Sequence, residues 1–162
     1  MADVKPLIFT MLGPSGSGKT SMLACMNRTL EGAVPGSFYP DRITLGILDD
    51  AYEALEAGAN ENKPQFNVHA IKGTEEISEF GFAIVGNKSS MPVKFYDFPG
   101  GYIERGSNDS DYNDVIQIVR QSAAIIVAVD APYIMEPEHE RGKYIRQACI
   151  REVERVIKEG TC

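Results

Sequence analysis

The sequence predicts an α/β fold, a three-layer sandwich around a mostly parallel sheet with one antiparallel edge strand. Three observations carry this prediction. A short apolar run, Leu7–Leu12, leads into a glycine-rich loop and then into a helical pattern. Two apolar segments separated by a short turn, Ile77–Val85 and Met91–Tyr96, predict a hairpin. The most apolar run of the chain, Ala123–Val129, suits a central strand.

The loop after the first strand, Gly13–Thr20, reads Gly-Pro-Ser-Gly-Ser-Gly-Lys-Thr and matches the P-loop pattern G-x-x-x-x-G-K-[ST]. Its glycines let backbone N–H groups turn inward and form a nest for phosphate oxygens. Lys19 is placed to reach the β- and γ-phosphates, and the Thr20 hydroxyl to bind Mg²⁺. The helix that follows, Ser21–Leu30, adds its positive N-terminal end. Strand, loop and helix in this order predict a P-loop NTPase sandwich. The expected nucleotide-binding residues are Gly13, Pro14, Ser15, Gly16, Ser17, Gly18, Lys19, Thr20 and Ser21.

The middle of the chain predicts one helix followed by a loop. Asp41–Ala57 has the spacing of an amphipathic helix, with Asp41 as its N-cap and Gly58 as its stop. Between Asn60 and Thr74 the sequence is polar and carries turn residues, so we expect a mobile loop. Pro99–Asp111 is glycine-rich and polar, and we expect a second mobile loop there.

The second half adds two helical patterns, Asp114–Gln121 and Glu138–Lys158. The inner stripe of the longer one is Tyr144, Ile145, Cys149, Val153, Val156 and Ile157. In the sheet, three strands are expected to be parallel neighbours: Leu7–Leu12, Met91–Tyr96 and Ala123–Val129. Ile77–Val85 is expected to run antiparallel at the edge.

A second motif stands at the end of the second hairpin strand. Asp97 follows the alternating segment Val93–Tyr96, and Gly100 comes three residues later. An Asp at the carboxyl end of a strand beside the P-loop strand can hold a water of the Mg²⁺ shell. The glycine offers a backbone N–H that can approach the γ-phosphate closely. The D-x-x-G pattern is weak alone, but it gains weight beside a P-loop.

On Gly13–Thr20 and Asp97–Gly100, the chain resembles the translation-factor-like class of P-loop GTPases, which includes Ras-like and dynamin-like proteins. In that class a threonine before the hairpin closes over Mg²⁺ and the γ-phosphate, and Thr74 stands at this place. Thr74 could instead be a loop threonine with no role, and the other candidate, Thr44, lies inside a predicted helix. The resemblance implies metal ligands Thr20, Thr74 and Asp97, and catalytic residues Lys19, Thr74 and Gly100. It also implies GTP or GDP with Mg²⁺, an effector or activating protein partner, and action as a nucleotide-operated switch.

More specifically, the chain looks like the bacterial double-GTPases, because a long stretch separates the P-loop helix from Thr74. Two departures matter. Gly101 stands where Ras-like enzymes carry a water-orienting glutamine, so intrinsic hydrolysis should be slow. The guanine-reading N/T-K-x-D motif is missing, because the pair Asn87-Lys88 lacks the Asp and falls in the hairpin turn. We therefore expect residues 1–162 to be the N-terminal part of a longer G domain, with guanine specificity implied by the resemblance alone.

Other P-loop classes remain as alternatives. Asp130, at the end of Ala123–Val129, could be the Mg²⁺-associated Asp of an ATPase, although Ala131 stands where many ATPases carry a catalytic Glu. The Leu-Ser-Gly-Gly signature of ABC-type ATPases is absent. A scaffold that binds nucleotide without hydrolysing it is a third reading, and Gly101 favours it.

Composition sets the broad class. A length of 162 residues with 43% hydrophobic and 24% charged residues suits one globular domain. The net charge is −7 and no basic patch stands out, which argues against nucleic acid as a partner. No apolar run has membrane-spanning length. Cys25, Cys149 and Cys162 lack metal-ligand spacing and indicate reduced thiols of a cytoplasmic protein, with Cys25 packed under the P-loop helix.

Overall fold

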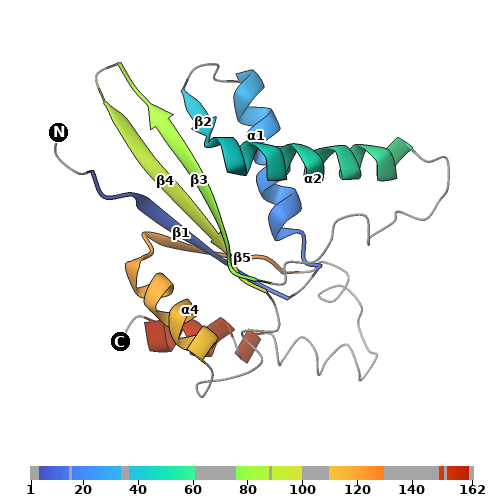
Figure 1. Ribbon diagram of the computed structural model, residues 1–162. Helices are drawn as coiled ribbons and strands as arrows, with labels where there is room; N and C mark the ends of the chain where they lie inside the picture. Colours follow the sequence, from blue (N-terminus) through green and yellow to red (C-terminus); the bar gives the residue numbers. More distant parts are fainter. Residues whose placement is uncertain are drawn as a thin grey trace.

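The computed structural model describes residues 4–14, 16–33, 37–60, 76–87, 89–99, 110–129, 150–151 and 153–160. Its strands form one sheet in the order β2-β3-β4-β1-β5, with helices on both faces (Figure 1). The elements in chain order are β1 (Leu7–Leu12), α1 (Lys19–Ala33), β2 (Phe38–Pro40), α2 (Arg42–Asn60), β3 (Ser78–Val85), β4 (Ser90–Asp97), α4 (Ser110–Gln121) and β5 (Ala124–Val127). The C-terminal helical segment covers residues 150–151 and 153–160.

The predicted α/β sandwich with its mostly parallel sheet is confirmed. β1 lies between β4 and β5 and is parallel to both, with Met11 opposite Asp97 and Phe9 opposite Ala124. β3 pairs antiparallel with β4 through the predicted hairpin and is the one described strand that runs against the rest. The short strand β2, which the sequence did not predict, adds to the outer side of β3. The carboxyl ends of β1 and β4 therefore meet at one edge of the sheet, beside the start of α1.

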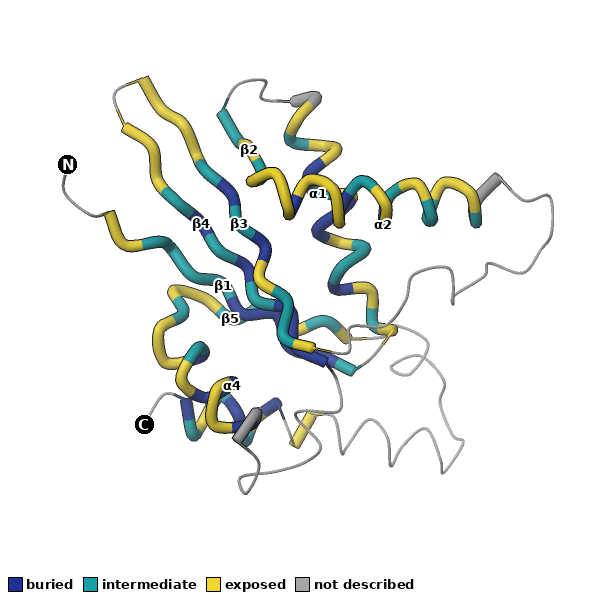
Figure 2. Tube along the Cα trace, in the orientation of Figure 1, coloured by how far each residue is buried: buried dark blue, intermediate teal, exposed yellow. Residues whose placement is uncertain are grey.

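Helices cover the sheet on both sides and enclose two apolar clusters. α1 and α2 pack on one face, where helix and strand side chains form the first cluster: Met11, Leu23, Leu48, Phe80, Phe82, Val93 and Phe95. α4 and the C-terminal helical segment pack on the other face, where the second cluster contains Leu12, Phe98, Tyr112, Val115, Val119, Val153 and Val156. The buried positions gather toward the carboxyl ends of β1 and β4 (Figure 2). This burial gives the residues that follow those ends a rigid support.

Three details of the sequence prediction are wrong. β5 is the last strand of the described sheet rather than a central one, and Val127 is 41% exposed. β5 is apolar because Ile125 and Ile126 pack into the clusters on opposite faces of the sheet. An edge strand that is covered by helices on both faces therefore has the same apolar composition as a central strand. α2 runs through Gly58 to Asn60, because a glycine costs a helix only about 1 kcal/mol. Cys25 is exposed, since α1 turns other residues toward the sheet.

The C-terminal stripe is confirmed where the structure describes it. Val153 and Val156 are buried, and Ile157 is partly buried against the same cluster. Tyr144, Ile145 and Cys149 lie outside the described residues. So do nearly all of the residues expected to form the two mobile loops.

The start of α2 is joined to β3 by a small polar network. The Thr44 backbone N–H donates to Asp41 Oδ1 at 2.7 Å, which confirms Asp41 as the N-cap. The Thr44 side-chain oxygen accepts a bond from the Gly81 N–H at 2.8 Å, and the Asp41 N–H donates to the Gly81 carbonyl at 2.8 Å. Thr44 is 1% exposed, so its hydroxyl holds the helix to the sheet and does not reach the P-loop edge.

Candidate functional site

The loop between β1 and α1 has a backbone that depends on its glycines. Gly13, Gly16 and Gly18 have φ angles of 147°, 77° and 83°, which residues with a side chain rarely adopt. At Gly13 the approach of neighbouring chain is also close, because a Cβ there would overlap the carbonyl oxygen of Ala128 beyond the end of β5. α1 begins at Lys19, directly after the loop. The loop thus brings its backbone to the N-terminal end of a helix, the arrangement that binds anions.

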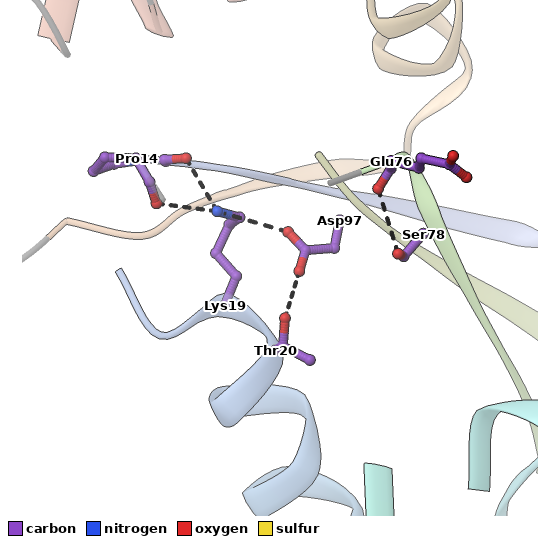
Figure 3. Close-up of polar contacts among 7 residues, drawn as sticks. Pro14, Lys19, Thr20, Glu76, Ser78 and Asp97 are labelled. Carbon is purple, nitrogen blue, oxygen red and sulfur yellow. Dashed lines mark hydrogen bonds and ion pairs between the residues drawn. The ribbon is translucent and has the colours of Figure 1, made fainter. Parts of the chain in front are cut away.

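Lys19 is the first residue of α1 and is nearly enclosed, with 6% of it exposed. Its Nζ donates to the carbonyl oxygens of Gly13 at 3.1 Å and Pro14 at 3.2 Å. Both acceptors belong to the loop itself, so the lysine folds back over it. The ammonium group is therefore held at the centre of the site rather than extended into solvent (Figure 3).

Asp97 is the last residue of β4 and is fully buried. Its Oδ2 accepts a hydrogen bond from the Thr20 hydroxyl at 2.7 Å. Its Oδ1 lies 3.7 Å from Lys19 Nζ, which is an ion-pair distance. Figure 3 shows both side chains at the start of α1 directed toward this carboxylate. The carboxylate of the second sequence motif therefore contacts two side chains of the first.

Ser17 contributes a buried polar atom to the loop. Its Oγ is buried and has no hydrogen-bond partner in the described part of the chain. It lies 3.1 Å from the point that a Gly13 Cβ would occupy, so it faces back toward the loop. We therefore expect Ser17 to serve a nucleotide through its backbone rather than its hydroxyl.

The predicted site residues fall into two groups. Those that the structure brings together are Gly13, Pro14, Gly16, Ser17, Gly18, Lys19, Thr20 and Asp97, with Ser21 half-buried one position further along α1. Those that lie outside the described residues are Ser15, Thr74, Gly100, Gly101 and Asp130. The alternative threonine, Thr44, lies in α2, and its hydroxyl oxygen accepts a hydrogen bond from Gly81 in β3.

The donor set at Thr20 and Asp97 fits Mg²⁺. A hydroxyl and a carboxylate are hard oxygen donors, and Mg²⁺ keeps several waters and is usually held by one or two protein groups plus substrate phosphates. In the chain as described, no group of three or more His, Cys, Asp or Glu side chains could hold a metal ion. Thr20 and Asp97 would therefore hold Mg²⁺ together with phosphate oxygens.

Two features of the neighbourhood were missed at the sequence level. One is the direct ion pair between Lys19 and Asp97. The other is a polar group behind the site, on the opposite face of the hairpin, where Glu79 accepts from the Tyr96 hydroxyl at 2.6 Å and contacts Lys94 at 2.7 Å. The hairpin register could have revealed it, because Glu79 and Tyr96 stand directly opposite each other.

This polar group shifts two titrations. Burial, and then the bond to the Glu79 carboxylate, raise the pKa of Tyr96 from 10.0 to about 12. Burial also raises the pKa of Glu79, but the bonds from Lys94 and Tyr96 outweigh it and bring the pKa below its ordinary 4.5. Tyr96 is the residue before Asp97, so this group supports the strand end that carries the carboxylate.

Within the described ranges, no helix has both the length and the apolar character needed to cross a membrane. The family model described as Double-GTPase 2 matches residues 8–161 and so includes both the P-loop and the Asp97 motif. No curated protein and no solved structure matches the chain. Since the match covers nearly the whole sequence, the chain belongs to the double-GTPase 2 family.

Proposed function

We propose that this chain binds guanine nucleotide with Mg²⁺ at its P-loop, hydrolyses GTP slowly and acts as a nucleotide-operated switch. The observation that most supports this is the meeting of Lys19, Thr20 and Asp97 at the carboxyl ends of two neighbouring parallel strands. In open α/β sheets, ligands bind outside the carboxyl ends of the strands. Guanine as the base rests on membership of the family.

Each of these groups has a distinct task in this proposal. The backbone N–H groups from Gly16 to Thr20 bind phosphate oxygens, and Lys19 adds a full positive charge to the β- and γ-phosphates. Thr20 and Asp97 hold Mg²⁺, which when bound neutralises phosphate charge. Asp97 takes this role in preference to Asp130, because it already bonds to Thr20 in the P-loop helix.

The proposal extends to residues that the structure does not describe. Thr74 completes the Mg²⁺ site, and the Gly100 N–H contacts the γ-phosphate. The position after it, Gly101, has no side chain to orient a water, so hydrolysis is slow until a protein partner supplies the missing group. The difference between triphosphate and diphosphate at Thr74 and Gly100 is the proposed switch.

The direct test is nucleotide selectivity followed by turnover. Fluorescent GDP, GTP and ATP are titrated into the purified chain with Mg²⁺, and GTP cleavage is followed in a single turnover. We expect GDP and GTP to bind more tightly than ATP, and cleavage to be slow but measurable. Tighter binding of ATP would favour the ATPase alternative. Tight GTP binding with no cleavage would favour the scaffold alternative and contradict hydrolysis.

A further inference from the structure

Among the described residues, three oxygens lie close to the ammonium group of Lys19. Two are the carbonyl oxygens of Gly13 and Pro14, at 3.1 Å and 3.2 Å, and the third is Asp97 Oδ1 at 3.7 Å. The two carbonyl oxygens accept N–H bonds from the ammonium group, and the carboxylate oxygen lies at ion-pair distance from it. A phosphate that binds Lys19 therefore competes with these neighbours for the ammonium group.

The two carboxylate oxygens of Asp97 act on different groups. Oδ2 accepts the proton of the Thr20 hydroxyl. Because that proton is used on Asp97, the lone pairs of the Thr20 oxygen remain for a cation. Oδ1 attracts Lys19, the same group that the phosphate needs. Oδ2 thus leaves the Thr20 oxygen able to bind a cation, while Oδ1 competes with phosphate for Lys19.

Burial makes this competition strong. Asp97 is fully buried and Lys19 is 6% exposed, so their attraction is poorly screened by water. The two carbonyl contacts carry no net charge. The carboxylate is therefore the neighbour of Lys19 that opposes a phosphate most, and a cation at Asp97 would relieve this opposition.

Resting on the proposed function, we infer that Asp97 couples nucleotide binding to magnesium by competing with phosphate for Lys19. Without Mg²⁺, the carboxylate retains Lys19 and weakens nucleotide binding. With Mg²⁺, the carboxylate interacts with the cation shell and Lys19 turns to the phosphates. The coupling is thus a property of the Lys19–Asp97 contact and not only of the metal ligands.

The test is GDP affinity in EDTA and in Mg²⁺ for the wild-type chain and Asp97→Asn. The amide cannot hold Lys19 by charge, so GDP should bind about tenfold more tightly in EDTA than it does to wild type, and the gain on adding Mg²⁺ should shrink. Asp114→Asn on α4 removes the same charge from an exposed position and should change neither value by more than about twofold. Equal or weaker EDTA binding by Asp97→Asn would overturn the inference.

A double-mutant cycle separates competition from simple repulsion between Asp97 and the phosphates. The EDTA gain from Asp97→Asn is measured with Lys19 present and in a Lys19→Met background. Competition predicts a larger gain when Lys19 is present. An equal gain in both backgrounds would mean that Asp97 only repels phosphate, and would overturn the inference.

Thr20→Val gives an independent test that does not depend on whether the Asp97 variants fold. It removes the Oδ2 bond and leaves the Lys19 contact, so the Mg²⁺ gain should fall, while EDTA binding should not rise as it does in Asp97→Asn. A rise in EDTA binding as large as that expected for Asp97→Asn would contradict the inference. Failure of the proposed function is distinct, because wild type would then bind neither GDP nor GTP under any of these conditions.

Discussion

Thr20 and Asp97, 77 positions apart in the sequence, share a 2.7 Å hydrogen bond between hydroxyl and carboxylate. Each residue comes directly from a rigid element, Thr20 from the second position of α1 and Asp97 from the end of β4. The parallel pairing of β1 with β4 brings the two elements to the same edge. The bond therefore joins the two sequence motifs and sets the distance over which a cation and phosphates would be held.

Replacing Gly13 by alanine should damage both the fold and the site. The new Cβ would overlap the Ala128 carbonyl oxygen on a backbone with a positive φ, so we expect a loss of about 1–3 kcal/mol in the free energy of unfolding. Nucleotide affinity should fall as well, because the Gly13 carbonyl holds Lys19. Chemical denaturation and GDP titration measure the two effects.

Gly46→Ala in α2 is the matched control for Gly13→Ala. Outside its own helix backbone and chain neighbours, no atom of the described residues lies within 4 Å of the place where its Cβ would be. Because alanine also favours helix, this variant should be stabilised by up to about 1 kcal/mol. If Gly13→Ala were as stable as Gly46→Ala, this would contradict the claim that the loop passes too close to Ala128 for a side chain at position 13.

The Glu79–Tyr96 contact should make stability depend on pH in the alkaline range. Because folding raises the pKa of Tyr96 from 10.0 to about 12, its contribution is complete below pH 10 and is lost as the pH rises through about 12. The difference in unfolding free energy between wild type and Tyr96→Phe should therefore shrink as the pH rises through this interval. Thermal unfolding across the interval, with the absorbance of the phenolate, is the measurement.

Glu79→Gln should bring the Tyr96 pKa down toward 10.0 but not reach it, since burial is the larger cause of the shift and remains. Glu76→Gln, an exposed carboxylate close by on the same chain segment, should leave that titration unchanged. A Tyr96 that titrated near 10 in the wild-type chain would contradict the contact.

The sequence predicts well what depends on contiguous residues. The P-loop, the strand before it and the helix after it all lie in one stretch, so their order could be inferred directly. Asp97 could be placed near the loop because strand ends beside a P-loop follow a known topology. The outer strand β2 was missed because three residues ending in Pro40 carry no alternation, and proline is tolerated there only at an edge.

What the sequence cannot give is the partner of each side chain within the site. Lys19 was expected to face phosphate, and nothing in its spacing indicates the contact with Asp97, which depends on a few ångströms of packing between α1 and β4. Similarly, an apolar run such as that of β5 indicates burial on two faces but not whether another strand lies beside it.

The proposed switch predicts a difference between nucleotide states in two segments, Asn60–Thr74 and Gly100–Asp111. A triphosphate offers Thr74 a bond to Mg²⁺ and offers the Gly100 N–H a γ-phosphate oxygen, and a diphosphate offers neither. Amide hydrogen exchange should therefore be slower in both segments with a non-hydrolysable GTP analogue than with GDP. The helix α4 should exchange equally in the two states, and equal exchange in the two segments would mean that the chain is not a switch.

Calorimetric titration of GDP with Mg²⁺ into wild type, Lys19→Ala and Lys5→Ala tests the central claim most directly. Removing the charge of Lys19 should cost about 1.5–3 kcal/mol, a loss of roughly 10- to 150-fold in affinity. Lys5 is exposed ahead of β1, so Lys5→Ala should bind as wild type does. Single-site binding that is weakened only by Lys19→Ala is the predicted result; unchanged affinity in Lys19→Ala would contradict nucleotide binding at this P-loop.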